Sequence, residues 1–315
     1  MDVVTIGETM VLLTPDDSGS LEQAVTFTKH LAGAESNVSI ALARLGHHVS
    51  WLSKVGADGF GRYILKTLRG EGVDVSRVVI DESRSTGVFF KETSPFYGTS
   101  VQYYRENSAA SEIRNEDVDR SLLHDARVFH VTGVTPALSL VNRKTLVSLL
   151  EEARRQEIRI SFDPNIRYKL WSIDEAIPVL HELATYADIV LPGLDEGKVL
   201  TGQTTPEGIA DWFLSRGCEL VVVKLGPQGA YYQTVHERGY VDGFEVTLVD
   251  EVGAGDAFAA GLLSGLLDNL KTDDSVRRAC ALGAMAVCGK GDYETLPRRR
   301  ELMAFMTGKS KIVNR

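Results

Sequence analysis

The chain has 315 residues, 43% of them hydrophobic, so it can bury a substantial core without disulfide or metal crosslinks. Its 34 Lys and Arg against 43 Asp and Glu leave a formal charge of −9, which argues against nucleic acid as a partner but not against a small anionic ligand. Three widely spaced cysteines, an acidic N-terminus and the lack of a long apolar run predict a cytoplasmic protein without a membrane partner.

Short β-branched runs alternate with helical patterns along the chain. Strands are expected at residues 3–6, 128–132, 158–162, 188–191 and 220–224. Most of these runs are apolar on both faces, as in strands that are covered on both sides. Residues 36–45 and 142–156 repeat apolar side chains at helical spacing. The alternation predicts an α/β fold whose mostly parallel sheet is crossed by helices.

Two segments interrupt this alternation. Residues near 10–30 contain a turn-rich stretch at 14–19 and little helical pattern, and residues near 84–108 contain two aromatic-rich runs around a turn at 94–98. The second segment is typical of a hairpin. Together the two segments predict either a small added sheet that acts as a lid or an ordinary surface hairpin, and the pattern alone does not decide between them.

The glycine-rich stretch from Val252 to Gly261 is the sharpest candidate site. Gly253, Ala254 and Gly255 precede an apolar helix, so several backbone N–H groups and the helix dipole would favour an anion there. The dipole would also keep Asp256 ionised, ready to take a proton from a substrate hydroxyl while the amides hold a transferred phosphoryl group. The alternative is a glycine turn in which Asp256 only caps the helix.

Other nucleotide and metal motifs are missing from the sequence. It contains no Walker-type G-x-x-x-x-G-K-[ST] loop, no strand that leads into G-x-G-x-x-G, and no H-E-x-x-H or Cys/His cluster. These absences argue against a Walker-type nucleotide site, a dinucleotide dehydrogenase and a zinc site. A metal ligand set stays unassigned.

Three motifs together resemble the PfkB/ribokinase family of sugar kinases. Residues 31–39, Leu-Ala-Gly-Ala-Glu-Ser-Asn-Val-Ser, are similar to the N-terminal motif of the family, and residues 55–61 are similar to its G-x-D-x-x-G segment. Residues 250–256 resemble its C-terminal D-T-x-G-A-G-D motif. The motifs occur in the family's order, and the resemblance covers essentially the whole chain.

The resemblance implies a ribokinase-like three-layer α/β/α sandwich with a mostly parallel central sheet and a small β-sheet lid. It would form one domain over residues 1–310, with lid strands inserted at about 10–30 and 84–108. It implies ATP-dependent phosphorylation of a sugar hydroxyl with Mg²⁺ as cofactor, and a homo-oligomer formed through the lid. Asp256 would be the base, and the amides of Gly253, Ala254 and Gly255 the anion hole.

The resemblance also implies the ligand contacts. Gly33 and Asn37 would touch the sugar. Lys224, Gly226 and Gly229 would belong to the nucleotide loop at 224–229. Two further residues, Asn165 and Glu196, would lie near the phosphates.

Two positions depart from the family pattern. Glu251 stands where Thr or Pro is usual, so the sequence assigns no monovalent cation to this loop. The family's N-x-x-E motif, which is tied to magnesium and phosphate, appears here as Gly193-Leu194-Asp195-Glu196, with the glutamate retained and the asparagine lost.

Two arginines bear on the choice of sugar. Arg105 ends a Y-x-R pattern and Arg167 follows a D-P-N pattern. Guanidinium groups match the shape and charge of a carboxylate, whereas a neutral sugar needs only hydrogen-bond partners. Both patterns resemble those of 2-keto-3-deoxygluconate kinases, which implies phosphorylation of the terminal hydroxyl of that sugar acid. The resemblance adds Gly33, Tyr103 and Asp292 to the pocket, and Phe89 could pack on the sugar or in the lid core.

Several alternatives stay open at this point. Arg105 could instead pair with a lid carboxylate such as Glu106, and Arg167 could bind a phosphate of ATP. A fructokinase or another sugar kinase of the family would share the mechanism. A catalytically silent sugar-binding regulator on the same fold is the more distant alternative, against which the retained Asp256 and glycine loop argue.

Overall fold

The computed structural model describes residues 1–16, 20–94 and 98–308. Within these ranges the central sheet has eight strands in the order β14-β13-β12-β11-β10-β9-β1-β4. The strands from β12 to β4 pair in parallel, whereas β13 and β14 are antiparallel at one edge, so the sheet is mostly parallel as predicted. In sheet order their bounds are Arg238–Val241, Ala230–Gln233, Leu220–Lys224, Ile189–Val190, Arg159–Asp163, Val128–Thr132, Val3–Ile6 and Val49–Leu52.

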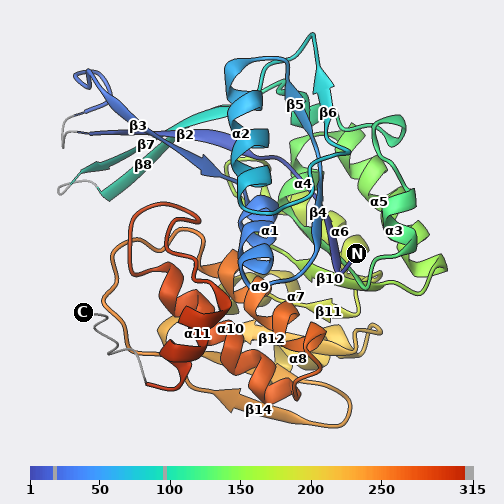
Figure 1. The fold of residues 1–315 in the computed structure, drawn as a ribbon. Helices are drawn as coiled ribbons and strands as arrows, with labels where there is room; N and C mark the ends of the chain where they lie inside the picture. The colour runs from blue at the N-terminus through green and yellow to red at the C-terminus, as the bar shows by residue number, and fades with distance from the viewer. Residues whose placement is uncertain (17–19, 95–97, 309–315) are drawn as a thin grey trace.

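Helices cover both faces of this sheet, which gives the three layers (Figure 1). Because side chains alternate along a strand, Val222 packs into one core while Val221 and Val223 pack into the other. The first core is completed by α1 (Ala34–Arg44), α2 (Gly59–Gly70), α9 (Ala254–Leu267), α10 (Thr272–Ala286) and α11 (Arg299–Met306). The second is completed by α3 (Ser121–His124), α5 (Leu140–Arg155), α6 (Ile173–Ala184), α7 (Leu194–Thr201) and α8 (Pro206–Leu214).

Local capping chemistry sets the helix boundaries. The expected helix at 142–156 begins at Leu140, because the hydroxyl of Ser139 accepts a hydrogen bond from the N–H of Asn142. The short α4 (Val134–Leu138) directly follows β9. Across the described residues, every helix is too short or too polar to cross a bilayer.

A second, four-stranded sheet has the order β3-β2-β7-β8 and projects from one side of the sandwich (Figure 1). Its strands are β2 (Met10–Pro15), β3 (Phe27–Ala32), β7 (Val88–Ser94) and β8 (Gly98–Tyr104), which lie in the two segments expected to hold added strands except that β3 extends two residues past the first. The predicted β7–β8 hairpin is present, with Val88 opposite Tyr104. Residues 17–19 and 95–97 of the two predicted turns lie outside the described residues.

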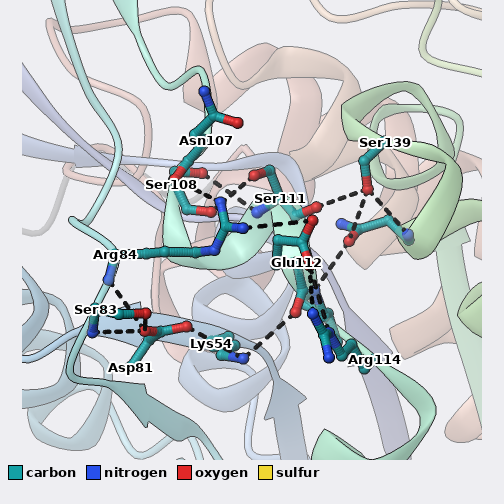
Figure 2. A network of polar contacts seen from close by, with 12 residues as sticks. Lys54, Asp81, Ser83, Arg84, Asn107, Ser108, Ser111, Glu112, Arg114 and Ser139 are labelled. Carbon is teal, nitrogen blue, oxygen red and sulfur yellow. Dashed lines mark hydrogen bonds and ion pairs between the residues drawn. The ribbon is translucent and has the colours of Figure 1, made fainter.

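Polar contacts fix the segments that join this small sheet to the sandwich (Figure 2). Lys54, on β5 (Lys54–Gly56), pairs at 3.2 Å with Asp81, at the end of β6 (Val79–Asp81). Arg84 donates to the carbonyl of Asn107 at 3.3 Å, which ties the segment entering β7 to the segment leaving β8.

The G-x-D-x-x-G segment supports the same junction. Asp58 caps α2 by accepting from the N–H groups of Phe60 and Gly61, and its other oxygen accepts from the N–H of Thr86 at 2.8 Å. A Cβ at Gly61 would lie 2.2 Å from the carbonyl oxygen of Gly56, so this turn requires glycine. The motif therefore anchors the base of the small sheet.

Candidate active site

The N-terminus of α9 faces the carboxyl ends of the parallel strands. Gly253 precedes the helix with φ 79°, and a Cβ there would lie 2.5 Å from the carbonyl oxygen of Asp292, so both backbone angle and space require glycine. The first-turn amides of α9, among them that of Gly255, have no acceptor within the helix. Ala254 donates only a long 3.4 Å hydrogen bond, to the carbonyl of Glu251. This terminus is suited to an anion.

Asp256 belongs to a buried cluster of two carboxyl groups and one amide. The Nδ2 of Asn37, from α1, donates to Oδ2 of Asp256 at 2.8 Å and lies 3.5 Å from Oδ2 of Asp292. All three side chains are nearly inaccessible. The side-chain oxygen of Asn37 and Oδ1 of Asp292 have no partner in the described residues, so a sugar hydroxyl could complete their hydrogen bonding.

Burial dominates the charge state of this cluster. It raises the pKa of Asp256 to about 6, against the hydrogen bond from Asn37 and the charge of Arg167. The sequence predicted that the helix dipole would keep Asp256 ionised. Burial acts in the opposite direction, although a group with this pKa is still mostly ionised at pH 7, as predicted. Burial and the charge of Asp256 raise the pKa of Asp292 to about 7.

Beside α9, Lys224 ends β12 and Asp163 ends β10, so their side chains meet at one sheet edge. The ammonium lies 2.8 and 3.0 Å from the two oxygens of Asp163. Burial by itself would lower the pKa of Lys224, but the charges of Asp163 and Glu196 and the hydrogen bonds to Asp163 together outweigh burial and raise the pKa. Asn165 follows with a positive φ of 38°, and a Cβ at Gly255 would lie 3.6 Å from the Lys224 ammonium. A positive charge is therefore fixed beneath the anion-binding terminus.

Both carboxylate oxygens of Glu196 accept hydrogen bonds from backbone amides. It accepts from the N–H of Gly193 at 2.8 Å and from the N–H of Ile166 at 2.8 Å. The first contact caps α7, and the second links it to the loop after β10. Glu196 still lines the cleft, and its carboxylate orients two loops there.

The backbone of the expected nucleotide loop requires glycine at positions 226 and 229. A 3₁₀ turn spans Gly226–Gln228, and Gly226 and Gly229 have positive φ of 60° and 99°. A Cβ at Gly229 would lie 2.0 Å from the carbonyl oxygen of Val241, so the loop packs directly on β14. Of the loop's expected residues, Lys224 lines the cleft and the two glycines shape the turn.

The small sheet presents an apolar face to the site. Phe89 is buried with Met10 and Leu12, and its ring centroid lies 5.3 Å from that of Tyr103. Of the two roles considered for Phe89, packing inside the sheet is the one that these contacts support. Tyr103 is half-buried beside it, with the guanidinium of Arg105 at 5.4 Å from its ring.

Arg105 is paired, but not with the partner considered from the sequence. Its guanidinium forms two contacts with Oε2 of Glu8, including a hydrogen bond from Nε at 2.7 Å, rather than pairing with Glu106. Glu8 follows the end of β1 and also accepts from the hydroxyl of Ser108 at 2.6 Å. Its carboxylate is fully buried, so the pair cancels most of the positive charge that Arg105 brings to the pocket. Gly33, whose Cβ would lie 2.6 Å from the Glu8 carbonyl, packs against the same segment.

Arg167 differs from Arg105 in its environment. It is exposed, lines the cleft with Asp163 and Asp256, and has no ion pair among the described residues. The cleft has a volume of about 260 Å³, enough for several phosphate-sized groups. In the part of the chain that the structure describes, no group of three or more His, Cys, Asp or Glu side chains is arranged to hold a metal ion by itself.

A helix N-terminus that carries a buried carboxyl group beside a fixed lysine suits phosphoryl transfer, and comparison with known proteins agrees. The family model described as "pfkB family carbohydrate kinase" matches residues 1–299. This chain belongs to the PfkB family. It is therefore a carbohydrate kinase of a family that uses ATP.

Curated relatives of this PfkB-family chain extend over nearly its whole length. It is 43% identical to a 2-dehydro-3-deoxygluconokinase from Bacillus subtilis (strain 168), over 99% of this chain and 97% of the relative. It is 33% identical to fructokinase-1 from Oryza sativa subsp. japonica, over 96% of this chain and 97% of the relative. A solved 2-dehydro-3-deoxygluconokinase from Thermotoga maritima superposes with a TM-score of 0.91 at 26% identity, covering 98% of each chain, which confirms the ribokinase-like fold.

Most of the predicted site residues of this kinase gather around one cleft. Its lining includes Asn165, Arg167, Glu196, Lys224, Gly253, Gly255 and Asp256. Asn37 donates a hydrogen bond to Asp256, and the same side-chain amide of Asn37 links Asp256 to Asp292. The residues of the small sheet form a second group, linked to the sandwich through the Glu8–Arg105 pair.

Four functional candidates were not found from the sequence. Glu8 could have been found, because polar residues at the ends of parallel strands gather at one edge. Asp163 was noted only as part of the D-P-N motif. Lys91 and Asp250 pair at 2.5 Å, yet 159 positions separate them and nothing in their local sequence predicts the contact.

Proposed function

We propose that this carbohydrate kinase transfers the γ-phosphoryl group of ATP to the terminal hydroxyl of 2-keto-3-deoxygluconate. The product would be 2-keto-3-deoxy-6-phosphogluconate. The observation that carries the chemistry is the buried Asp256 at the N-terminus of α9, beside the Asp163–Lys224 pair. The 43% identity to the Bacillus subtilis relative supports the choice of sugar.

The chain's own groups account for the steps. Asp256 takes the proton of the attacking hydroxyl, for which a pKa of about 6 suits a base at neutral pH. The first-turn amides of α9 stabilise charge on the transferred group, and the unpaired Arg167 adds a positive charge at the cleft. Lys224 holds a fixed positive charge at the phosphate end. Gly226 and Gly229 shape the nucleotide loop.

Mg²⁺ fits this site as a partner of ATP rather than as a protein-held ion. No metal-holding cluster occurs among the described residues, and of the acidic groups that line the cleft Asp163 is engaged by the ammonium of Lys224 and Glu196 by backbone amides. When bound with ATP, Mg²⁺ would neutralise phosphate charge. A solved protein from E. coli, provisionally identified as ribokinase II, is described in complex with ATP and Mg²⁺ and superposes with a TM-score of 0.91 at 28% identity, covering 98% of this chain and 99% of that one.

The sugar acid would lie between the two sheets. Gly33, Asn37 and Asp292 would meet its hydroxyls, and Tyr103 its face. Arg167 and the remaining N–H groups of Arg105 would meet the carboxylate. The small sheet, within one domain, would serve as the lid that excludes water from the transferred phosphoryl group.

We further propose a cytoplasmic homo-oligomer assembled through the outer face of the small sheet. Three rings lie edge to edge there: the centroids of Phe27 and Phe90 are 5.5 Å apart, and those of Phe90 and Tyr104 are 5.7 Å apart. Tyr104 is 59% exposed, which leaves apolar area for a second copy.

Fructokinase activity is the second candidate. The Glu8–Arg105 pair favours it, because the pair reduces the positive potential that would attract a carboxylate. An ADP-release assay over 2-keto-3-deoxygluconate, 2-keto-3-deoxygalactonate, fructose and ribose separates the candidates. The highest kcat/KM should be for 2-keto-3-deoxygluconate. A higher value for fructose would replace the proposed substrate, and no turnover with any sugar would refute the proposed chemistry.

A further inference from the structure

Lys91 joins the small sheet to the glycine loop that precedes α9. It lies on β7, two residues after Phe89, and therefore on the same face of the strand. Its side chain is 10% exposed, and its ammonium lies 2.5 Å from Oδ2 of Asp250. Because Lys91 is buried and its ammonium pairs with a carboxylate outside the small sheet, this ion pair fixes the distance between the sheet and the loop.

Asp250 also forms a hydrogen bond with the backbone of the loop. Its other oxygen, Oδ1, accepts from the N–H of Val252 at 3.3 Å. The N–H groups of Val249 and Asp250 both donate to the carbonyl of Val287, so the start of the loop is tied to the end of α10. One carboxylate thus bridges the small sheet and the peptide just before Gly253.

The position of that peptide determines where the anion-site amides point. Gly253 has a left-handed backbone and packs against the carbonyl of Asp292 with no room for a Cβ. Burial raises the pKa of Asp292, and the charge of Lys91 partly offsets that rise, which places the ammonium near the same cluster. A shift of Val252 would move the amides of Gly253 and Ala254, which follow it directly, relative to Asp256 in the first turn of α9.

We propose that Lys91 is a positioning residue that acts through Asp250 to hold the anion-site amides in place when the small sheet covers the cleft. The inference rests on the proposed kinase activity, and it assigns Lys91 a role other than contacting the sugar. Seating the sheet would then complete the site for phosphoryl transfer. A matched contact exists for comparison: Lys169 donates to the carbonyl of Val101 on β8 at 2.8 Å, which also links the sheet to the sandwich but does not touch the loop.

The test compares Lys91→Met with Lys169→Met in the full-length enzyme, by ADP release at saturating ATP. A misplaced catalytic group can cost about 100-fold in rate, so kcat of Lys91→Met should fall by about that factor. Its KM for the sugar should change less than about threefold, because no sugar contact is lost. Lys169→Met should keep kcat within about threefold of wild type. Lys91→Arg, which retains the charge, should recover much of the loss.

Two further measurements separate positioning from general damage. Asp250→Asn should reproduce the fall in kcat, and millimolar methylammonium should partly restore Lys91→Ala but not Asp250→Asn. Activities are corrected for the folded fraction by thermal unfolding. Equal losses in Lys91→Met and Lys169→Met, or a rise in KM at unchanged kcat, would overturn the inference. A wild-type enzyme inactive on all four sugars would instead overturn the proposed function.

Discussion

Replacing Asp256 by Asn should abolish most activity and at the same time stabilise the fold. Burial raises the pKa of Asp256 from 3.8 to about 6, so the native state holds this charge less readily than the unfolded chain does. A shift of one pKa unit corresponds to about 1.4 kcal/mol, and a shift of roughly two units costs the native state about 3 kcal/mol at pH 7. Asn carries no charge, and its side-chain oxygen can still accept from Asn37.

The sign gives this effect a pH window. A carboxyl group with a raised native pKa destabilises fully above about pH 6 and loses most of that effect as the pH falls from 6 toward the unfolded-state value of 3.8, below which both states are protonated. The Asn variant should therefore unfold about 5 °C above wild type at pH 7 and at nearly the same temperature at pH 4. Its kcat should fall by about 100- to 10,000-fold, the range for loss of a general base.

Calorimetry at pH 7 and pH 4, with ADP release at pH 7, measures both quantities on one preparation. Sugar affinity, from isothermal titration without ATP, serves as the control and should change little. A variant no more stable than wild type at pH 7, or a gain that does not depend on pH, would refute the argument from burial. Unchanged turnover would refute the assignment of Asp256 as base.

Three further outcomes are expected. In wild type, kcat/KM should fall about tenfold for each pH unit below about 6; a limb near pH 4 would mean that Asp256 titrates as a solvated carboxyl. Arg105→Leu should raise KM for 2-keto-3-deoxygluconate more than for fructose, and should lower the unfolding temperature because Glu8 is left buried and unpaired; equal changes in KM would count against carboxylate recognition. Gly253→Ala should destabilise by about 1–3 kcal/mol and lower kcat, because its Cβ would collide with a carbonyl; calorimetry showing wild-type stability would contradict the backbone argument.

The fold and the transfer site could largely be predicted from local patterns. Buried strands are apolar on both faces, and the carboxyl ends of parallel strands share one edge, so the residues at the ends of β1, β10 and β12 were expected on the same edge of the sheet. The glycines before α9 predicted an anion site for a reason that holds in any context: a helix N-terminus has free amides. The alternation along β7 placed Phe89 on the apolar face of the small sheet, where it packs with Met10 and Leu12.

The rest depends on distances that no local pattern encodes. The partner of Arg105 is Glu8, 97 positions away, and not the adjacent Glu106. The pKa of Asp256 depends on how completely the surrounding elements exclude water, and the local sequence does not encode that burial. Ion pairs and burial arise from packing between elements, whereas capping and strand alternation arise within them.

The bridge from Asn37 to Asp256 and Asp292 has a consequence for synthesis of the protein on the ribosome. The amide is made early and both carboxylates late, so a nascent chain of 250 residues already carries Gly33, Arg105 and Arg167 but lacks Asp256, Asp292 and the N-terminus of α9. If the proposed mechanism holds, such an incomplete chain could not transfer the γ-phosphoryl group of ATP.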